Sequence, residues 1–82
     1  MPPPSRAEVG AILAAHLENL YAFYGEHQGV RIARKHIGWY CKDAEGAAVF
    51  RALVNPCEHA AHQLALTREF FGSQPGREQL AA

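Results

Sequence analysis

Apolar residues recur every three to four positions along most of the chain, which is the spacing of an amphipathic α-helix. A first helix is predicted from Ser5 to Gly25. Its apolar stripe would contain Val9, Ile12, Leu13, Leu17, Leu20, Tyr21 and Tyr24. Ser5 and Glu8 have the spacing of a capping box, in which each side chain bonds the backbone N–H of the other residue. Gly25 suits the position after a helix C-terminus, because glycine tolerates left-handed backbone angles.

Three further helices are predicted after Gly25. The second begins at Gln28 or Gly29 and runs to about Lys42. The third covers about Glu45 to Val54, with Asp43 as a candidate N-cap, and its inward stripe would contain Ala47, Phe50, Leu53 and Val54. The fourth begins at the sequence NPCE, where Asn55 would cap the helix and Pro56 would take its first position. It runs to about Phe71, with Cys57, Ala60, Ala61, Leu64 and Phe71 on one side.

The expected fold is therefore all-α, a small antiparallel four-helix bundle, because no segment alternates like a half-buried strand and the turns are short. A chain of 82 residues holds one domain at most. We expect a linker or segment start at residues 1–4, the helical domain at 5–72 and a flexible tail at 73–82. No apolar run approaches the roughly 18 residues of a membrane span, so a soluble protein is expected. Cys41 and Cys57 are not in CxxC spacing and no secretory signal precedes them, so reduced thiols in a cytoplasmic protein are expected. We also expect a monomer.

Charge is distributed unevenly along a chain that is neutral as a whole. Eight basic residues balance eight acidic ones, yet half of the basic residues fall within residues 31–42, and no carboxylate lies between Glu26 and Asp43. On a helical wheel, these cations share one arc of about 100°. They are Arg31, Arg34, Lys35 and Lys42. The opposite arc, which should face the core, contains Val30, Ala33, Ile37, Tyr40 and Cys41.

The residues alone leave three interpretations of this arc open. It is a solvated face with acidic partners on other helices, a nucleic-acid site, or a surface that docks on another protein or domain. Like charges repel along a helix, and a polyanion would reverse that effect. Arg51, on one face with Asn55, would extend the charge. Beside the arc, Trp39 would stack on a base or dock against a second domain.

Residues with catalytic or metal-binding spacing are not evident. His59 and His62 share a helix face, but no third ligand accompanies them. No Ser-His-Asp set, glycine-rich phosphate loop or carboxylate pair stands out. The sequence therefore predicts neither a catalytic site nor a metal site.

Three segments, HLENLYAFYGEHQGVRIARKHIGWY, FRALVN and QLALTREFF, resemble the C-terminal helical domain of bacterial tRNA-dihydrouridine synthases of the B-type, NifR3-like group. The resemblance implies a larger enzyme with an N-terminal TIM-type barrel that carries FMN. That barrel would use electrons from NADPH to reduce a D-loop uridine of tRNA, with a barrel cysteine as general acid. The chain itself would have no cofactor and no catalysis of its own. Its expected partners are tRNA and the FMN-binding barrel of the same polypeptide.

The resemblance also extends to specific residues. Arg31, Arg34, Lys35 and His36 match the family's RxxRKH segment, which implies contact with the tRNA backbone. Arg51 and Asn55 match FRxxxN, while His36 and Trp39 are alternatively expected at the barrel interface. Two other functions remain as alternatives, a protein–protein interaction module and a DNA-binding helical bundle.

Overall fold

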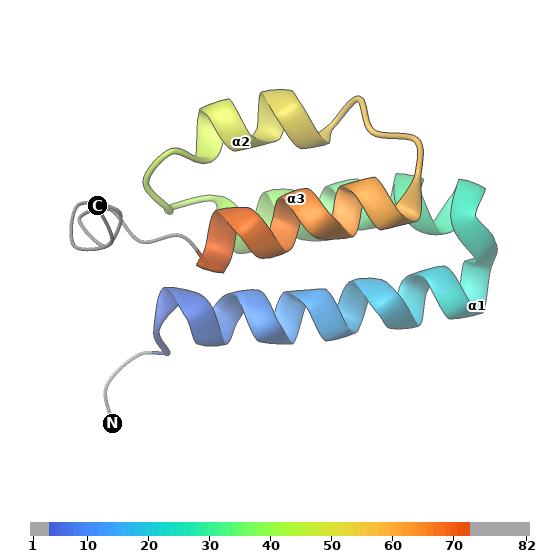
Figure 1. Ribbon diagram of the computed structural model, residues 1–82, viewed down its shortest axis with the longest axis horizontal. Coiled ribbons are helices and arrows are strands. Elements are labelled where there is room, and N and C mark those ends of the chain that lie inside the picture. The colour runs from blue at the N-terminus through green and yellow to red at the C-terminus, as the bar shows by residue number, and fades with distance from the viewer. Residues whose placement is uncertain (1–3, 73–82) are drawn as a thin grey trace.

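The computed structural model describes residues 4–72, and all of their regular structure is helical (Figure 1). Helix α1 spans Arg6–Cys41, α2 spans Ala47–Val54 and α3 spans Ala60–Gly72. The all-α class is confirmed, but the expected four helices are not, because the first two predicted helices together form α1. Apart from Pro4, the predicted linker 1–4 and the predicted flexible tail 73–82 lie outside the described residues.

Helix α1 begins with the predicted capping box. The Glu8 backbone N–H donates to Ser5 Oγ at 3.1 Å, and the Ser5 N–H donates to Glu8 Oε1 at 3.0 Å. These bonds to Ser5 lower the pKa of the Glu8 carboxyl, because they stabilise its charged form. The local sequence pattern was sufficient to fix this helix start.

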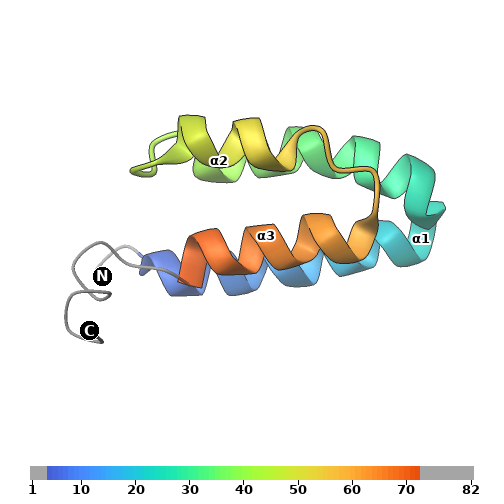
Figure 2. The ribbon, with the colours of Figure 1, turned by 45° about the horizontal axis from the view of Figure 1, so that its top comes forward.

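Gly25 divides α1 into an N-terminal arm, residues 6–24, and a C-terminal arm, residues 26–41. Its φ of 81° and ψ of 172° lie outside the helical region, in a conformation that suits only glycine. The two arms run antiparallel and lie side by side (Figures 1 and 2). Gly29 lets them approach closely, since a Cβ there would be 3.1 Å from both Leu20 O and Tyr21 Cα.

Helix α2 corresponds to the third predicted helix, with two corrections. It starts at Ala47 after Gly46, which has a φ of 80°, and no side chain caps it, so Asp43 is not the N-cap. Phe50 and Val54 are buried as expected, whereas Leu53 is 58% exposed. Leu53 lies about 100° from Val54 around the axis, outside the strip that the other helices cover.

Helix α3 starts later than the sequence suggested. Asn55 is the C-cap of α2, and its backbone N–H donates to Arg51 O at 2.9 Å. The predicted start at Asn55 and Pro56 is therefore wrong, and α3 begins at Ala60. The Ala60 N–H donates to Glu26 Oε2 at 2.9 Å. Because this acceptor comes from the C-terminal arm of α1, the sequence around residue 60 gives no sign of it.

The core lies where α3 and α2 cover the two arms of α1. Its main members are Leu13, Leu17, Leu20, Ala33, Ile37, Cys41, Phe50, Val54 and Phe71. Two polar side chains, Gln63 and Thr67, are also fully buried. Tyr21 Oη donates to Gln63 Oε1 at 2.5 Å, and Gln63 Nε2 donates to Val30 O at 3.1 Å. Buried polar groups need such partners, so Gln63 joins α3 to both arms.

Several side chains predicted to face inward lie instead at the rim of the core. Ile12 is 56% exposed, Tyr24 is 44% exposed and Tyr40 is 37% exposed, and Ala61 of α3 is also exposed. Each occupies the edge of its helix's apolar stripe. With only three helices, no further helix among the described residues covers those edges.

Candidate nucleic-acid interface

The C-terminal arm of α1 turns its cations outward. Arg31, Lys35 and Lys42, the C-cap residue that follows the arm, are exposed, and we call these three residues the basic face. The opposite side of the same arm is buried, with Val30, Ala33, Ile37 and Cys41 at most 1% exposed. The predicted orientation of this helix about its axis is therefore confirmed for these positions. Because the apolar side is buried in the core, the charged side faces solvent.

No acidic side chain among residues 4–72 forms an ion pair with the basic face. The ion pairs of the described residues are Arg68 with Glu18, and His59 with Glu26 at 3.9 Å. A shallow hollow of about 300 Å³ lies beside Arg31 and Lys35 and is also lined by Gln28 and Ile32. Repulsion among these cations is therefore not relieved by a neighbouring helix in the described part of the chain.

Arg34 differs from the other three cations of the segment because it is partly buried. Its Nη2 donates to the Cys57 carbonyl at 3.0 Å, and its Nε is buried without a hydrogen-bond partner. This contact ties the C-terminal arm of α1 to the connection between α2 and α3. The structure thus gives Arg34 a role in the fold and does not bring it fully into the basic face.

Arg51 and Asn55 lie on α2 and are both exposed. Burial raises the pKa of the Cys41 thiol, and the nearby Arg51 charge opposes that shift. Asn55 sits at the last turn of α2, where its backbone closes the helix.

A row of aromatic rings crosses from one arm of α1 to the other. His16 Nε2 and His36 Nδ1 lie 3.1 Å apart, one acting as donor and the other as acceptor according to tautomer. The His36 ring meets the Trp39 ring edge to face, with centroids 5.1 Å apart at 73°. Trp39 itself is 66% exposed. His16 was missed by sequence reasoning, because only the antiparallel return of α1 brings it beside His36.

We expect this histidine contact to make stability depend on pH. Burial, then His16, then Lys35 lower the pKa of His36 below its ordinary value of 6.5. Above that value the ring is neutral in both the folded and unfolded chain. Below it the unfolded chain takes up the proton more readily than the folded chain, so the free energy of unfolding should fall as the pH is lowered below 6.5.

Urea denaturation at several pH values would measure the effect. His36→Gln should remove this part of the pH dependence, whereas His27→Gln, at an exposed position, should retain it. The same pH dependence in His36→Gln and the unmodified chain would contradict the assignment.

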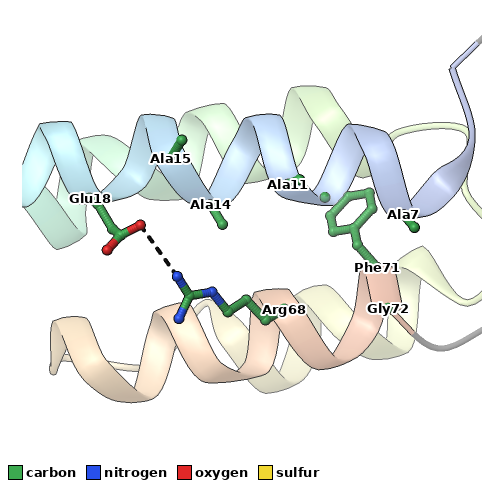
Figure 3. Close-up of a pocket in the computed structure, with 9 residues that line it drawn as sticks. Ala7, Ala11, Ala14, Ala15, Glu18, Arg68, Phe71 and Gly72 are labelled. Carbon is green, nitrogen blue, oxygen red and sulfur yellow. Dashed lines mark hydrogen bonds and ion pairs between the residues drawn. The ribbon is translucent and has the colours of Figure 1, made fainter.

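A second hollow lies on another side of the molecule, between the N-terminal arm of α1 and α3 (Figure 3). It has a volume of about 360 Å³ and is lined largely by alanine and glycine. Phe71 points from α3 toward α1, and Arg68 Nη2 meets Glu18 Oε1 at 3.3 Å. None of the predicted site residues lines it, so the candidate interface is confined to the C-terminal arm of α1 and to α2.

The sequence of the chain matches a known protein family. The sequence profile described as dihydrouridine synthase (Dus) matches residues 1–74. The chain belongs to the dihydrouridine synthase family. The matched range includes the basic face, Arg34, Trp39 and all of α2 and α3.

The individual relatives in the dihydrouridine synthase family are much longer than this chain. The tRNA-dihydrouridine synthase B of Xanthomonas campestris pv. campestris is 61% identical over 71 residues, which are 87% of this chain and 21% of the relative. The protein of that name from Pseudomonas syringae pv. tomato is 51% identical over 71 residues, with the same shares. The one from Pseudomonas aeruginosa is 46% identical over 74 residues, 90% of this chain and 22% of the relative. The chain therefore spans about a fifth of the length of these curated relatives.

Within residues 4–72, this dihydrouridine synthase family chain gathers no group of three or more His, Cys, Asp or Glu side chains that could hold a metal ion. His59 faces Glu26, while His62 Nδ1 lies 3.5 Å from Cys57 Sγ. The two histidines of the HxxH spacing thus have different neighbours.

Among the described residues, no helix is both long enough and apolar enough to cross a membrane.

Proposed function

We propose that the chain is the C-terminal, tRNA-binding helical domain of a B-type tRNA-dihydrouridine synthase. The observation that carries the proposal is the basic face. Its three cations are exposed on one side of a helix, and the opposite side of that helix is buried in the core. The relatives' shared name, tRNA-dihydrouridine synthase B, supports tRNA as the polyanion.

In this function the basic face binds phosphates and positions the RNA. A helix cannot read base edges in the deep, narrow major groove of RNA, and cations on its surface contact the backbone instead. Arg31, Lys35 and Lys42 are the direct phosphate contacts, and Arg51 extends them across to α2. Arg34 acts mainly by holding the α2–α3 connection, through its bond to the Cys57 carbonyl.

The chemistry in this proposal belongs to the rest of the longer protein. An FMN-carrying barrel of the same polypeptide would reduce a D-loop uridine of tRNA with electrons from NADPH. No residue of 4–72 is assigned to FMN, to NADPH or to catalysis. The helical domain contributes affinity and orientation, which set where the barrel meets its uridine.

A second candidate, docking on a protein surface, has its own support. On α2, Val49 is 69% exposed and Leu53 is 58% exposed, four residues apart on one side of the helix. Side chains at this spacing are neighbours on a helix surface. This surface would fit the barrel of the same polypeptide or another protein. It contains none of the residues of the basic face, so docking there and RNA binding could occur together.

Titration of the 82-residue chain with a tRNA transcript, a DNA duplex and inorganic polyphosphate tests the proposed function. Three phosphate contacts predict a tRNA affinity that falls about 20- to 40-fold between about 50 mM and about 200 mM salt. The tRNA should bind more tightly than the DNA duplex at both concentrations. Tighter binding of duplex DNA would favour a DNA-binding bundle, and no binding to any polyanion would favour the protein-docking function.

A further inference from the structure

Trp39 is the large aromatic side chain that borders the basic face. It is 66% exposed, although burying such a ring is strongly favourable. It follows Lys35 by four residues and precedes Lys42 by three, and residues at these spacings are neighbours on a helix surface. The indole therefore lies between two exposed cations along the arm.

The Trp39 ring packs against His36 and is otherwise largely exposed to solvent. His36 packs edge to face against it at a centroid distance of 5.1 Å, and His36 is held in turn by His16, with the two ring nitrogens 3.1 Å apart. His16 belongs to the N-terminal arm of α1, so the orientation of Trp39 is supported from both arms. A ring fixed in this way loses little conformational entropy when a flat ligand covers it.

We propose that Trp39 stacks on an unpaired nucleobase of the bound RNA, while Lys35 and Lys42 hold the phosphates on either side of that nucleotide. This inference rests on the proposed RNA-binding function and adds a contact to a base. Exposed bases of loops and single strands stack on aromatic side chains, whereas a continuous duplex offers no free base face. Along the helix axis, Lys35 and Lys42 lie about 6 Å and about 4.5 Å from Trp39, within reach of one nucleotide.

Charge favours a nucleotide over an apolar protein surface at this position. The cations of the basic face have no acidic partner in the described part of the chain, and an apolar surface that covered Trp39 would also bury those charges unpaired. A polyanion neutralises the cations while its base covers the indole. The proposed ligand is therefore an RNA with at least one base outside a helix.

Intrinsic fluorescence can report this contact directly, because Trp39 is the single tryptophan of the chain. The full 82-residue chain would be titrated with oligouridine, a tRNA transcript, a blunt RNA duplex of matched length and inorganic polyphosphate. Stacking should quench the emission with oligouridine and with tRNA. The duplex and polyphosphate should bind through charge and leave the emission nearly unchanged.

A matched pair of variants tests the contribution to affinity. Trp39→Leu keeps an apolar side chain without a stacking face and should weaken oligouridine binding about 5- to 150-fold. Trp39→Phe keeps a ring and should lose much less. Neither variant removes a charge, so the salt dependence of binding should be unchanged. Circular dichroism would show that both variants fold, as expected for an exposed position.

Two results would overturn the proposal and separate it from the proposed function. If tRNA binds with unchanged Trp39 emission, or if Trp39→Leu binds oligouridine and tRNA as tightly as the unmodified chain, stacking is wrong while phosphate binding stands. Trp39 would then serve another surface, such as a protein contact. If no RNA binds at all, both the stacking and the RNA-binding function are wrong.

Discussion

Gly10→Ala is expected to destabilise the folded chain by about 3 kcal/mol, because α1 and α3 leave no room for a methyl group at this position. The added Cβ would overlap Phe71 Cβ and would lie 3.6 Å from Phe71 Cα. These atoms are part of the α3 backbone or next to it, so a change of rotamer cannot relieve the overlap. Phe71 is 2% exposed and points toward α1 (Figure 3), so α3 itself would have to move. Thermal unfolding followed by circular dichroism should show a Tm lower by about 12–24 °C.

The same substitution at Gly38 is the matched control. Gly38 lies in the same helix, and a Cβ there would meet no atom within 4 Å. Alanine has the higher helix propensity, so Gly38→Ala should stabilise the chain by about 1 kcal/mol. The two variants therefore have opposite expected signs. Equal effects at both positions would mean that α3 does not approach α1 at Gly10 as the structure shows.

Removing two charges of the basic face should strongly weaken RNA binding. The double variant Arg31→Gln, Lys35→Gln is expected to lower tRNA affinity about 25- to 60-fold at about 0.1 M salt, because two phosphate contacts are lost. The slope of log affinity against log salt should become shallower by about 1.4–1.8. Stability should change little, because neither side chain forms an ion pair within the described part of the chain. Filter binding or anisotropy at several salt concentrations would measure both quantities.

An equal change of net charge elsewhere provides the control for that experiment. Ala61 and Ala65 are exposed on α3, so the double variant Ala61→Glu, Ala65→Glu also lowers the net charge by two. If binding depends on the basic face, this variant should lose only a small part of the affinity. Similar losses in the two double variants would show that overall charge governs binding, and would remove the main support for the proposed interface.

Local sequence patterns predicted the parts of the fold that depend on neighbouring residues. The capping box of Ser5 and Glu8, the break at Gly25 and the outward rotation of Lys35 all depend on residues within a few positions of one another. By contrast, the start of α3 was wrong by several residues. Its acceptor, Glu26, lies 34 positions away, and Asn55 and Pro56 resemble a helix start although they follow the end of α2.

In the candidate site, too, local patterns predicted some features, and contacts between distant residues decided others. Periodicity placed Arg31, Arg34, Lys35 and Lys42 on one arc, but it could not show that Arg34 bends toward the Cys57 carbonyl, 23 positions away. Nor could it reveal the support of His36 by His16, which are 20 positions apart. Hydrophobic spacing also assigns polar residues to the surface, so the burial of Gln63 was not predicted.

The sequence by itself determined that this chain is helical, where α1 begins and bends, and which side of its C-terminal arm carries charge. These properties follow from backbone preferences and from a repeat of about 3.6 residues, both of which act over short stretches. The tertiary structure decided which cations stay in solvent, what supports Trp39, and where α3 starts. Those outcomes depend on hydrogen bonds and packing between segments 20 to 34 positions apart, and no local pattern encodes which distant groups will meet.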